Sequence, residues 1–204
     1  MTKTIHNIEL YKKTLKHILM HFNKVPEEQI DEFVDLFSLE SYKKKAIIIP
    51  PNNVHHHQFF FIVKGIVRIY YEAEGKEITS DFKETNSFFV NGYTLFTGYP
   101  NIDFHQALDD TICLVANYND IESLSKKYHA IEHLGRKMVE NYYAIYLKAN
   151  YNKLFLSAEE RYNVFVNERA SIMNQIPLRY VASHLGITPE TLSRLRSKFQ
   201  NIKT

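Results

Sequence analysis

The stretch Leu178–Phe199 reads LRYVASHLGITPETLSRLRSKF and lies near the end of the 204-residue chain. Within it Ala182 and Gly186 stand four residues apart, with apolar residues around them at positions 181, 185, 187, 192 and 195. A helix-turn-helix needs this spacing, because a small alanine lets the second helix cross closely and glycine adopts the positive φ of the turn at little cost. The stretch therefore predicts two short helices joined by a tight turn.

The second of these helices is expected to begin with Thr188 as N-cap and Pro189 at the first helical position, where the missing N–H costs nothing. At about 100° per residue, one side of the helix carries Leu192, Leu195 and Phe199, and the opposite side carries Glu190, Thr191, Arg194 and Lys198. Any surface helix shows a polar side. This one, however, has a carboxylate for cytosine N4, a threonine for methyl or phosphate contact and an arginine for guanine. We therefore favour a DNA-reading helix over an ordinary amphipathic corner.

Charge and composition agree with this interpretation without deciding it. The chain has a net charge of +2, yet residues 177–204 hold five basic side chains against a single acidic one, Glu190. Such a basic segment is a weak signature of nucleic-acid binding. The residues expected to contact DNA are Arg179, Thr188, Glu190, Thr191, Arg194, Arg196 and Lys198.

The chain as a whole has the composition of a folded protein, with 45% hydrophobic and 24% charged residues. Its apolar runs are too short to span a bilayer and its N-terminus has no secretory signal pattern, so we expect no membrane association. A single cysteine, Cys113, excludes an intramolecular disulfide and is expected to be an inert buried thiol. These features fit a protein of the cytoplasm.

The first two thirds of the chain change pattern twice. Residues 5–22 and 26–40 carry helical spacing, and Pro26 suits the opening of the second helix. From about residue 45 to 118 the sequence consists of short runs rich in Ile, Val, Phe and Tyr, separated by turn residues such as Gly65, Gly75 and Asn91–Gly92. Seven or eight short strands of this kind are typical of a sandwich or a jelly roll.

After residue 118 the pattern becomes helical again. A seam suited to packing along a long helix is formed by Ile131, Leu134, Met138, Tyr142 and Ile145. The seam predicts either a dimer helix, which we favour, or packing onto the chain's own β domain. Ser157 and Glu160 form a capping box, which predicts a further helix at about 158–170.

The order of these elements resembles the Crp/Fnr family of transcription regulators, and most of all its short members typical of Bacteroidetes. The segments that carry the resemblance are FFFIVKGIVRIYYEAEGKEIT (59–79), QALDDT (106–111) and ITPETLSR (187–194). The last is similar to the family's recognition helix, in which Glu190 and Arg194 match the base-reading residues. The sequence departs from the family pattern at Pro189, which stands in place of an arginine, and it ends without the β-hairpin wing of many relatives.

The resemblance implies an α+β fold in three parts. These are N-terminal helices with a β jelly-roll (cyclic-nucleotide-binding-like) sensor domain at 1–122, a dimerisation helix at 123–155 and an all-α helix-turn-helix domain at 156–204. It further implies a homodimer on a palindromic site of double-stranded DNA, with RNA polymerase as a partner. The alternative function is a ligand-binding or interaction protein whose helix-turn-helix no longer reads DNA, which the missing wing and Pro189 would favour.

The expected nucleotide pocket of the roll is degenerate. Cyclic-nucleotide-binding relatives use a glutamate for the ribose hydroxyl and an arginine for the cyclic phosphate, where this chain has Asn91 and Asn101. No Lys or Arg occurs between Phe88 and His105, and a buried phosphate without a cation is costly. We therefore expect no cAMP binding and no cofactor, and leave open an unknown small-molecule effector or none. Candidate pocket residues are Phe89, Asn91, Tyr93, Phe96, Tyr99 and Asn101.

Two other kinds of site were weighed against the sequence. The run His55–His57 invites a metal-dependent cupin, but the glutamate that such a site needs shortly afterwards is missing, and His105 is the only later histidine on the roll. A haem ligated by His105 or His133 has no supporting pattern. No phosphate-binding loop, nucleophile elbow or catalytic carboxylate pair is present either. We expect no metal site and no enzymatic activity.

Overall fold

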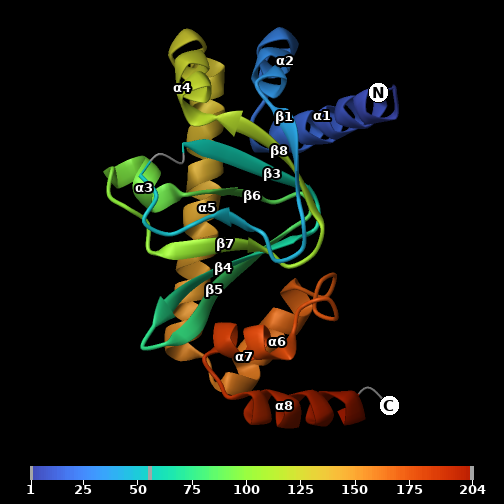
Figure 1. The fold of residues 1–204 in the computed structure, drawn as a ribbon, viewed down its shortest axis with the longest axis vertical. Coiled ribbons are helices and arrows are strands. Elements are labelled where there is room, and N and C mark those ends of the chain that lie inside the picture. The colour runs from blue at the N-terminus through green and yellow to red at the C-terminus, as the bar shows by residue number, and fades with distance from the viewer. Residues whose placement is uncertain (1, 55–56, 203–204) are drawn as a thin grey trace.

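The computed structural model describes residues 2–54 and 57–202 of the chain. The molecule is elongated, with a group of helices at one end, the β-sheets in the middle and further helices at the other end (Figure 1). A single long helix runs along the side of all three layers. The fold is of the predicted α+β class.

Within the described residues, eight antiparallel strands form two four-stranded sheets with the orders β1-β8-β3-β6 and β2-β7-β4-β5. The strands are β1 Ser38–Tyr42, β2 Ile47–Ile49, β3 Gln58–Lys64, β4 Ile66–Ala73, β5 Lys76–Glu84, β6 Phe88–Val90, β7 Asp103–Ala107 and β8 Thr111–Asn117. Successive strands along the chain alternate between the sheets through most of the domain, which is the jelly-roll arrangement. The predicted jelly roll is confirmed.

Alternation along each strand produces a core between the sheets and a second apolar layer outside each of them. On β4, Val67 points into the core between the sheets, whereas Ile66 faces the C-terminal helices. The inner core also contains Phe60, whose ring stacks on Phe89 at 4.5 Å between centroids, and Cys113. Burial raises the pKa of the Cys113 thiol to about 12, so this cysteine is the inert core thiol that the sequence predicts.

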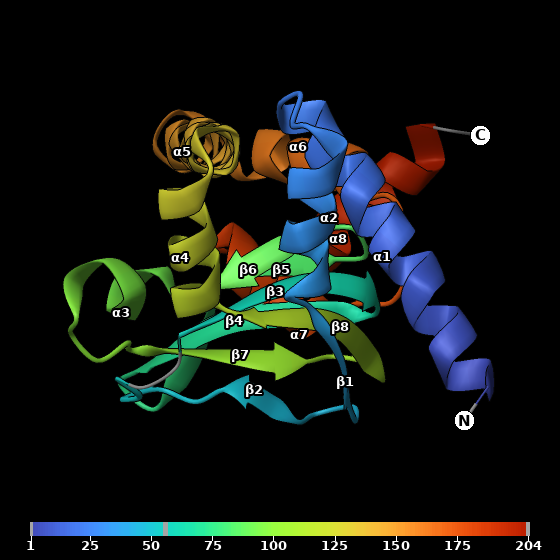
Figure 2. The same cartoon turned by 90° about the horizontal axis from the view of Figure 1, so that it is seen from above.

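The helices at the first end cover the sheet β1-β8-β3-β6. They are α1 Thr2–Phe22, α2 Glu27–Asp35, α4 Tyr118–Lys127 and the start of α5 His129–Phe155. Their buried side chains share one cluster with Phe61 and Leu114 of that sheet. Figure 2 shows α5 end-on beside the sheets, with α1 and α2 lying next to one another.

The predicted helix at 26–40 is too long. Helix α2 ends at Asp35, and Ser38–Tyr42 instead forms β1, whose residues pair with Thr111–Val115 of β8. Leu39 continues the helical spacing of the preceding residues, but backbone pairing at the sheet edge replaces the helix there. Likewise, Asn91–Gly92 is not a simple turn, because Asn91 caps a short helix, α3 Gly92–Thr97.

The predicted apolar seam of the long helix α5 is buried in its first half and exposed in its second half. Ile131 and Leu134 are buried and Met138 packs against the same cluster, so the first half of the seam packs within the chain. Tyr142 and Ile145, farther along, are each 56% exposed. The predicted boundary at 122/123 falls inside α4, and α5 ends at Phe155, where the long helix was expected to end.

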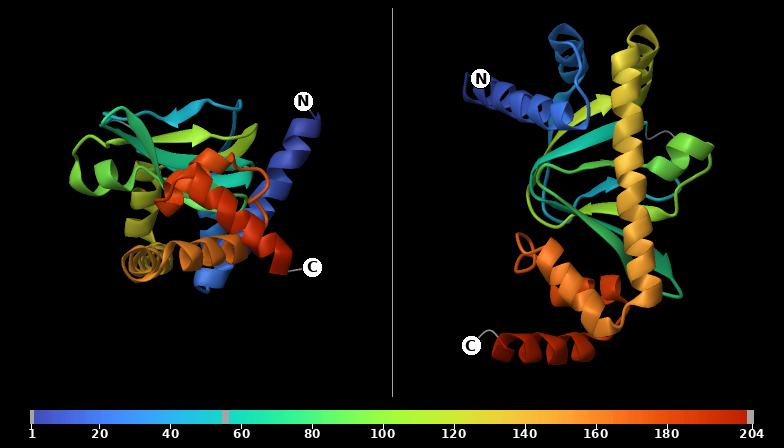
Figure 3. Two further views of the ribbon diagram at one scale, coloured as in Figure 1. Left: turned by 90° about the horizontal axis from the view of Figure 1, so that it is seen from below. Right: turned by 180° about the vertical axis from the view of Figure 1, so that it is seen from behind.

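The C-terminal end consists of α6 Ala158–Glu168, α7 Leu178–Leu185 and α8 Pro189–Ile202. The predicted capping box at the start of α6 is present, with Ser157 and Glu160 bonded to each other's backbone N–H. The core of these helices includes Ile66 and Phe82, which belong to the sheet β2-β7-β4-β5. Helix α8 lies on the far side of the group, away from the sheets (Figure 3).

Candidate nucleic-acid interface

The turn between α7 and α8 has the geometry that its sequence predicts. Gly186 ends α7 in the left-handed conformation, with φ 65° and ψ 36°, where a glycine avoids the strain of a side chain. The hydroxyl of Thr188 accepts a hydrogen bond from the backbone N–H of Thr191 at 3.2 Å. Helix α8 then begins at Pro189. The N-cap and the proline fix where the second helix starts.

One side of α8 anchors it to the rest of the C-terminal helices. Leu192 is fully buried, and Leu195 and Phe199 pack against the same cluster. The Phe199 ring lies 5.4 Å from that of Tyr162 on α6. The predicted apolar stripe is therefore confirmed as the side that holds the helix in place.

The opposite side of α8 faces outward. Glu190, Arg194 and Lys198 are exposed and Thr191 is half-buried. The Arg194 guanidinium donates to the hydroxyl of Thr191 at 3.3 Å, which keeps the two side chains together. Backbone and Thr188 hydrogen bonds hold the pKa of Glu190 below its usual range, so its carboxylate is an acceptor at neutral pH. The exposed side thus presents a hydrogen-bond acceptor beside a guanidinium donor.

The remaining candidate DNA contacts lie on α7 (Arg179), just before α8 (Thr188) and on α8 itself (Arg196 and Lys198). Thr188 and Arg179 are exposed, whereas Arg196 is half-buried. Lys198 forms an ion pair with Glu159 on α6, with its Nζ 2.7 Å from a carboxylate oxygen. Because both partners are about half exposed, that pair is weak and a phosphate can compete for the lysine.

The six candidate effector-pocket residues differ widely in exposure. Phe89, Asn91 and Asn101 are buried, whereas Tyr93, Phe96 and Tyr99 are 58–66% exposed on and after α3. The side-chain amide of Asn101 braces a loop, because its Nδ2 donates to the backbone oxygens of Pro50 and Asp103 and its Oδ1 accepts from the backbone of Asn53. Asn101, which stands where nucleotide-binding relatives carry arginine, therefore has its side-chain amide engaged in hydrogen bonds within the loop.

Two buried polar atoms remain in this part of the roll. The Nδ1 of His105 and the Nδ2 of Asn91 have no hydrogen-bond partner among the described residues. The other ring nitrogen of His105 lies 3.5 Å from a carboxylate oxygen of Asp103. Burial raises the pKa of Asp103, but hydrogen bonds from His105 and Asn101 outweigh it and the pKa is lowered. The surroundings are thus acidic, which disfavours an anionic ligand.

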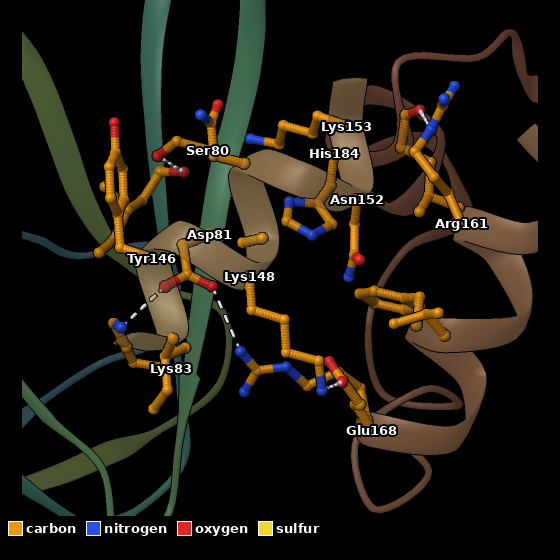
Figure 4. A pocket seen from close by; sticks show the side chains of 18 of the residues that line it. Ser80, Asp81, Lys83, Tyr146, Lys148, Asn152, Lys153, Arg161, Glu168 and His184 are labelled. Carbon is orange, nitrogen blue, oxygen red and sulfur yellow. Dashed lines mark hydrogen bonds and ion pairs between the residues drawn. The ribbon is translucent and has the colours of Figure 1, made fainter. Parts of the chain in front are cut away.

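A cleft of about 640 Å³ lies elsewhere, between β5, the second half of α5 and the helices α6 and α7 (Figure 4). Most of its charges are paired, both within β5 and between elements. Asp81 accepts from Lys83 at 2.7 Å and from Arg169 at 3.3 Å, and Lys148 pairs with Glu168 at 2.7 Å. His184 reaches into the same space from α7 (Figure 4). The cleft is where the sheet β2-β7-β4-β5, the long helix α5 and the C-terminal helices meet.

The contact between the sheet and α7 was missed by the sequence analysis. Arg68 on β4 is fully buried, and its guanidinium lies 3.6 Å from the ring centroid of Tyr180 on α7. The available signal was an arginine at an outward position of an otherwise apolar strand. The partner across the interface could not be predicted, because no spacing rule links Arg68 to a residue 112 positions later in the chain.

His55 and His56 lie outside the described residues, and the described part of the chain contains no group of three or more His, Cys, Asp or Glu side chains that could hold a metal ion. None of the helices in residues 2–54 and 57–202 is both long and apolar enough to cross a lipid bilayer.

Solved structures with the same architecture decide the fold. FixK2 from Bradyrhizobium japonicum superimposes with a TM-score of 0.69 at 19% identity, covering 82% of this chain and 86% of that one. A protein described as a transcriptional regulator of the Crp/Fnr family from Eubacterium rectale gives a TM-score of 0.65 at 18% identity, covering 86% and 84%. The fold is that of the Crp/Fnr regulators.

A CooA variant from Carboxydothermus hydrogenoformans is similar to the same extent, with a TM-score of 0.65 at 23% identity over 82% of this chain and 78% of that one. No family model matches the sequence, and no curated protein matches it either. The Crp/Fnr-like architecture is therefore established by shape, at identities that show the fold alone. It includes both the jelly roll and the C-terminal helices, as the sequence predicts.

Proposed function

We propose that the protein is a Crp/Fnr-like transcription regulator that binds double-stranded DNA through α8. The observation that carries the proposal is the division of α8 into a buried side around Leu192 and an outward side bearing Glu190 and Arg194. Arg194 is the donor for guanine O6 and N7, and the ionised Glu190 is the acceptor for cytosine N4. Thr188, Arg179, Arg196 and Lys198, on α7, just before α8 and along α8, are the proposed phosphate contacts.

The proposal includes a homodimer that places two copies of α8 about one DNA turn apart on a palindromic site. Its support is the second half of α5, where Val139, Tyr142, Ile145 and Tyr146 are each more than half exposed. A row of large apolar side chains on one helix is the kind of surface that protein partners cover. A second copy of α5 is the proposed partner, and RNA polymerase is a proposed further partner of the dimer on DNA.

The jelly roll is proposed to be a sensor that no longer takes cAMP. The amide of Asn101 is fully occupied within the loop, and Asp103 makes the surroundings acidic. A cyclic phosphate would therefore be buried without a cation. We propose no cofactor, an effector of another class if one exists, and action in the cytoplasm as a DNA-binding protein and not as an enzyme.

The base-reading role is tested with Arg194→Ala on a duplex that the wild-type protein selects from a random library. We expect the free energy of DNA binding to weaken by about 1–3 kcal/mol per half-site. The base preference should relax only at the base pairs that Arg194 contacts. Arg179→Ala is the matched control, because a phosphate contact should weaken binding to all sequences and lower the salt dependence instead. Unchanged affinity and unchanged base preference in Arg194→Ala would refute the assignment.

A further inference from the structure

The contact between the sensor sheet and α7 is organised around one buried cation. Arg68 on β4 is fully buried, although arginine is almost never so placed unless it is paired. Its Nε donates to the Thr79 hydroxyl at 2.9 Å and its Nη1 lies 2.6 Å from a carboxylate oxygen of Glu77, both on the neighbouring strand β5. The guanidinium is thereby held in a fixed plane on the outer face of the sheet.

The two faces available to that guanidinium are aromatic. Its central carbon lies 4.2 Å from the ring centroid of Tyr70 on the same strand and 3.6 Å from that of Tyr180 on α7. The Tyr70 ring in turn stacks on Phe104 of β7 at 4.8 Å. The Arg179 guanidinium lies 4.6 Å from the Tyr180 ring and donates to its hydroxyl at 3.0 Å. A continuous stack therefore runs from the sheet to a residue proposed to touch DNA.

A second set of bonds fixes α7 along the strand. β5 is the last strand of its sheet, so one edge of its backbone has no neighbouring strand. The hydroxyl of Ser183 on α7 accepts from the Thr79 N–H at 2.9 Å and donates to the Glu77 carbonyl oxygen at 3.2 Å. An edge strand needs partners for these groups, and here the helix-turn-helix supplies them at one defined position.

We propose that Arg68, Tyr180 and Ser183 are positioning residues for DNA reading. Their stack and edge bonds fix the α7–α8 pair on the sheet of its own chain, and in a dimer this fixes the separation and angle of the two recognition helices. The inference rests on the proposed function, because it concerns how that DNA reader is oriented. It assigns to the β4–β5 hairpin the task of setting the half-site spacing.

The test compares the full-length protein and two variants on the selected palindrome, on the same palindrome with its spacer changed by two base pairs, and on a single half-site. Tyr180→Leu removes the ring but keeps an apolar side chain, and Ser183→Ala removes the edge bonds without harming the helix. Tyr118→Leu is the matched control, because this half-exposed tyrosine is the first residue of α4, at the opposite end of the molecule from α7 (Figure 1).

The wild type and Tyr118→Leu should bind the original spacing about tenfold or more tightly than the altered one, which corresponds to the loss of one well-placed contact. In Tyr180→Leu the preference should fall to about twofold, since a desolvated cation–π contact is worth roughly a tenfold change in an equilibrium constant. Affinity for the single half-site should stay within about twofold of the wild type, because α8 itself is unchanged. Ser183→Ala should likewise lower the preference for the original spacing.

Two results would overturn the inference. One is an unchanged preference for the original spacing in both variants. The other is an equal loss of affinity for the half-site and for the palindrome, which would mean that these residues only keep the helix-turn-helix folded. If Tyr180→Leu does not unfold cooperatively, Ser183→Ala alone decides between these outcomes. A wild type without any palindrome preference would refute the proposed function itself.

In that event the attachment of α7 to the sheet through Arg68, Tyr180 and Ser183 can still be tested without DNA. The measurement is the distance between spin labels at Lys76→Cys and Ser197→Cys. The native Cys113 is buried and does not take up label, and dilution with unlabelled protein isolates the distance within one chain. A distance distribution that is broader in Tyr180→Leu than in the wild type supports this attachment, and an unchanged distribution refutes it.

Discussion

Replacing Phe82 with alanine should loosen the C-terminal helices from the sheet β2-β7-β4-β5. Phe82 belongs to β5 and is fully buried, yet its ring contacts Phe165 on α6 at 6.1 Å and His184 on α7 at 5.5 Å between centroids. A buried Phe→Ala change costs about 3–5 kcal/mol. Aromatic contacts of this kind contribute about 0.5–1.5 kcal/mol each beyond burial, so roughly 1–3 kcal/mol of the loss falls on the contact with the helices.

Hydrogen exchange read by mass spectrometry measures both parts of that effect. Phe82→Ala should lower the global stability and raise exchange at residues 158–185 by about tenfold to a hundredfold, because each 1.4 kcal/mol is a factor of ten. Phe60→Ala is the matched control, since this ring is equally buried but lies in the core between the sheets. Equal effects of the two variants on residues 158–185, or no effect of Phe82→Ala there, would refute the shared core.

Three further predictions concern other parts of the molecule. Burial lowers the pKa of His184 below its ordinary 6.5, so the unfolded chain takes up a proton there before the folded one does and stability should fall as the pH drops from about 7.5 to about 5.5. In urea titrations, His184→Gln should remove this part of the dependence of unfolding free energy on pH. Asp81 does not contribute in this range, because its pKa is lowered from 3.8. An unchanged pH dependence would contradict the assignment. Ser157→Ala should cost about 0.5–2 kcal/mol in thermal unfolding through loss of the capping box, whereas a change below the error of the measurement would show that the cap is dispensable. Ile145→Lys should yield a folded monomer in sedimentation analysis, because a charge enters the exposed apolar face of α5, and a retained dimer would place the interface elsewhere.

Local sequence rules predicted most of the elements because each has its own signal. Gly186, Thr188 and Pro189 define the turn and the start of α8 without reference to any other part of the chain, and Ser157 with Glu160 does the same for α6. The strand runs between residues 45 and 118 were equally readable. The error at 36–40 arose because Leu39 fits a helical period and a strand edge alike.

The interface between sheet and helices was not predictable in the same way. Nothing in the sequence near Arg68 indicates that its guanidinium meets Tyr180, because that contact depends on how two separately folded segments dock. The candidate effector pocket had the same difficulty. Family position placed Asn101 and Tyr99 in one pocket, but the structure buries the first as a loop brace and exposes the second. Where a side chain points after docking is a property of the whole fold.

The central claim, that α8 reads DNA sequence as part of a dimer, is tested most directly by selecting duplexes from a random library with the full-length protein at physiological salt. The account predicts a palindromic consensus whose half-sites are centred about one helical turn apart, bound at least about a thousandfold more tightly than random duplex. Binding that is sensitive to salt but blind to sequence would contradict it.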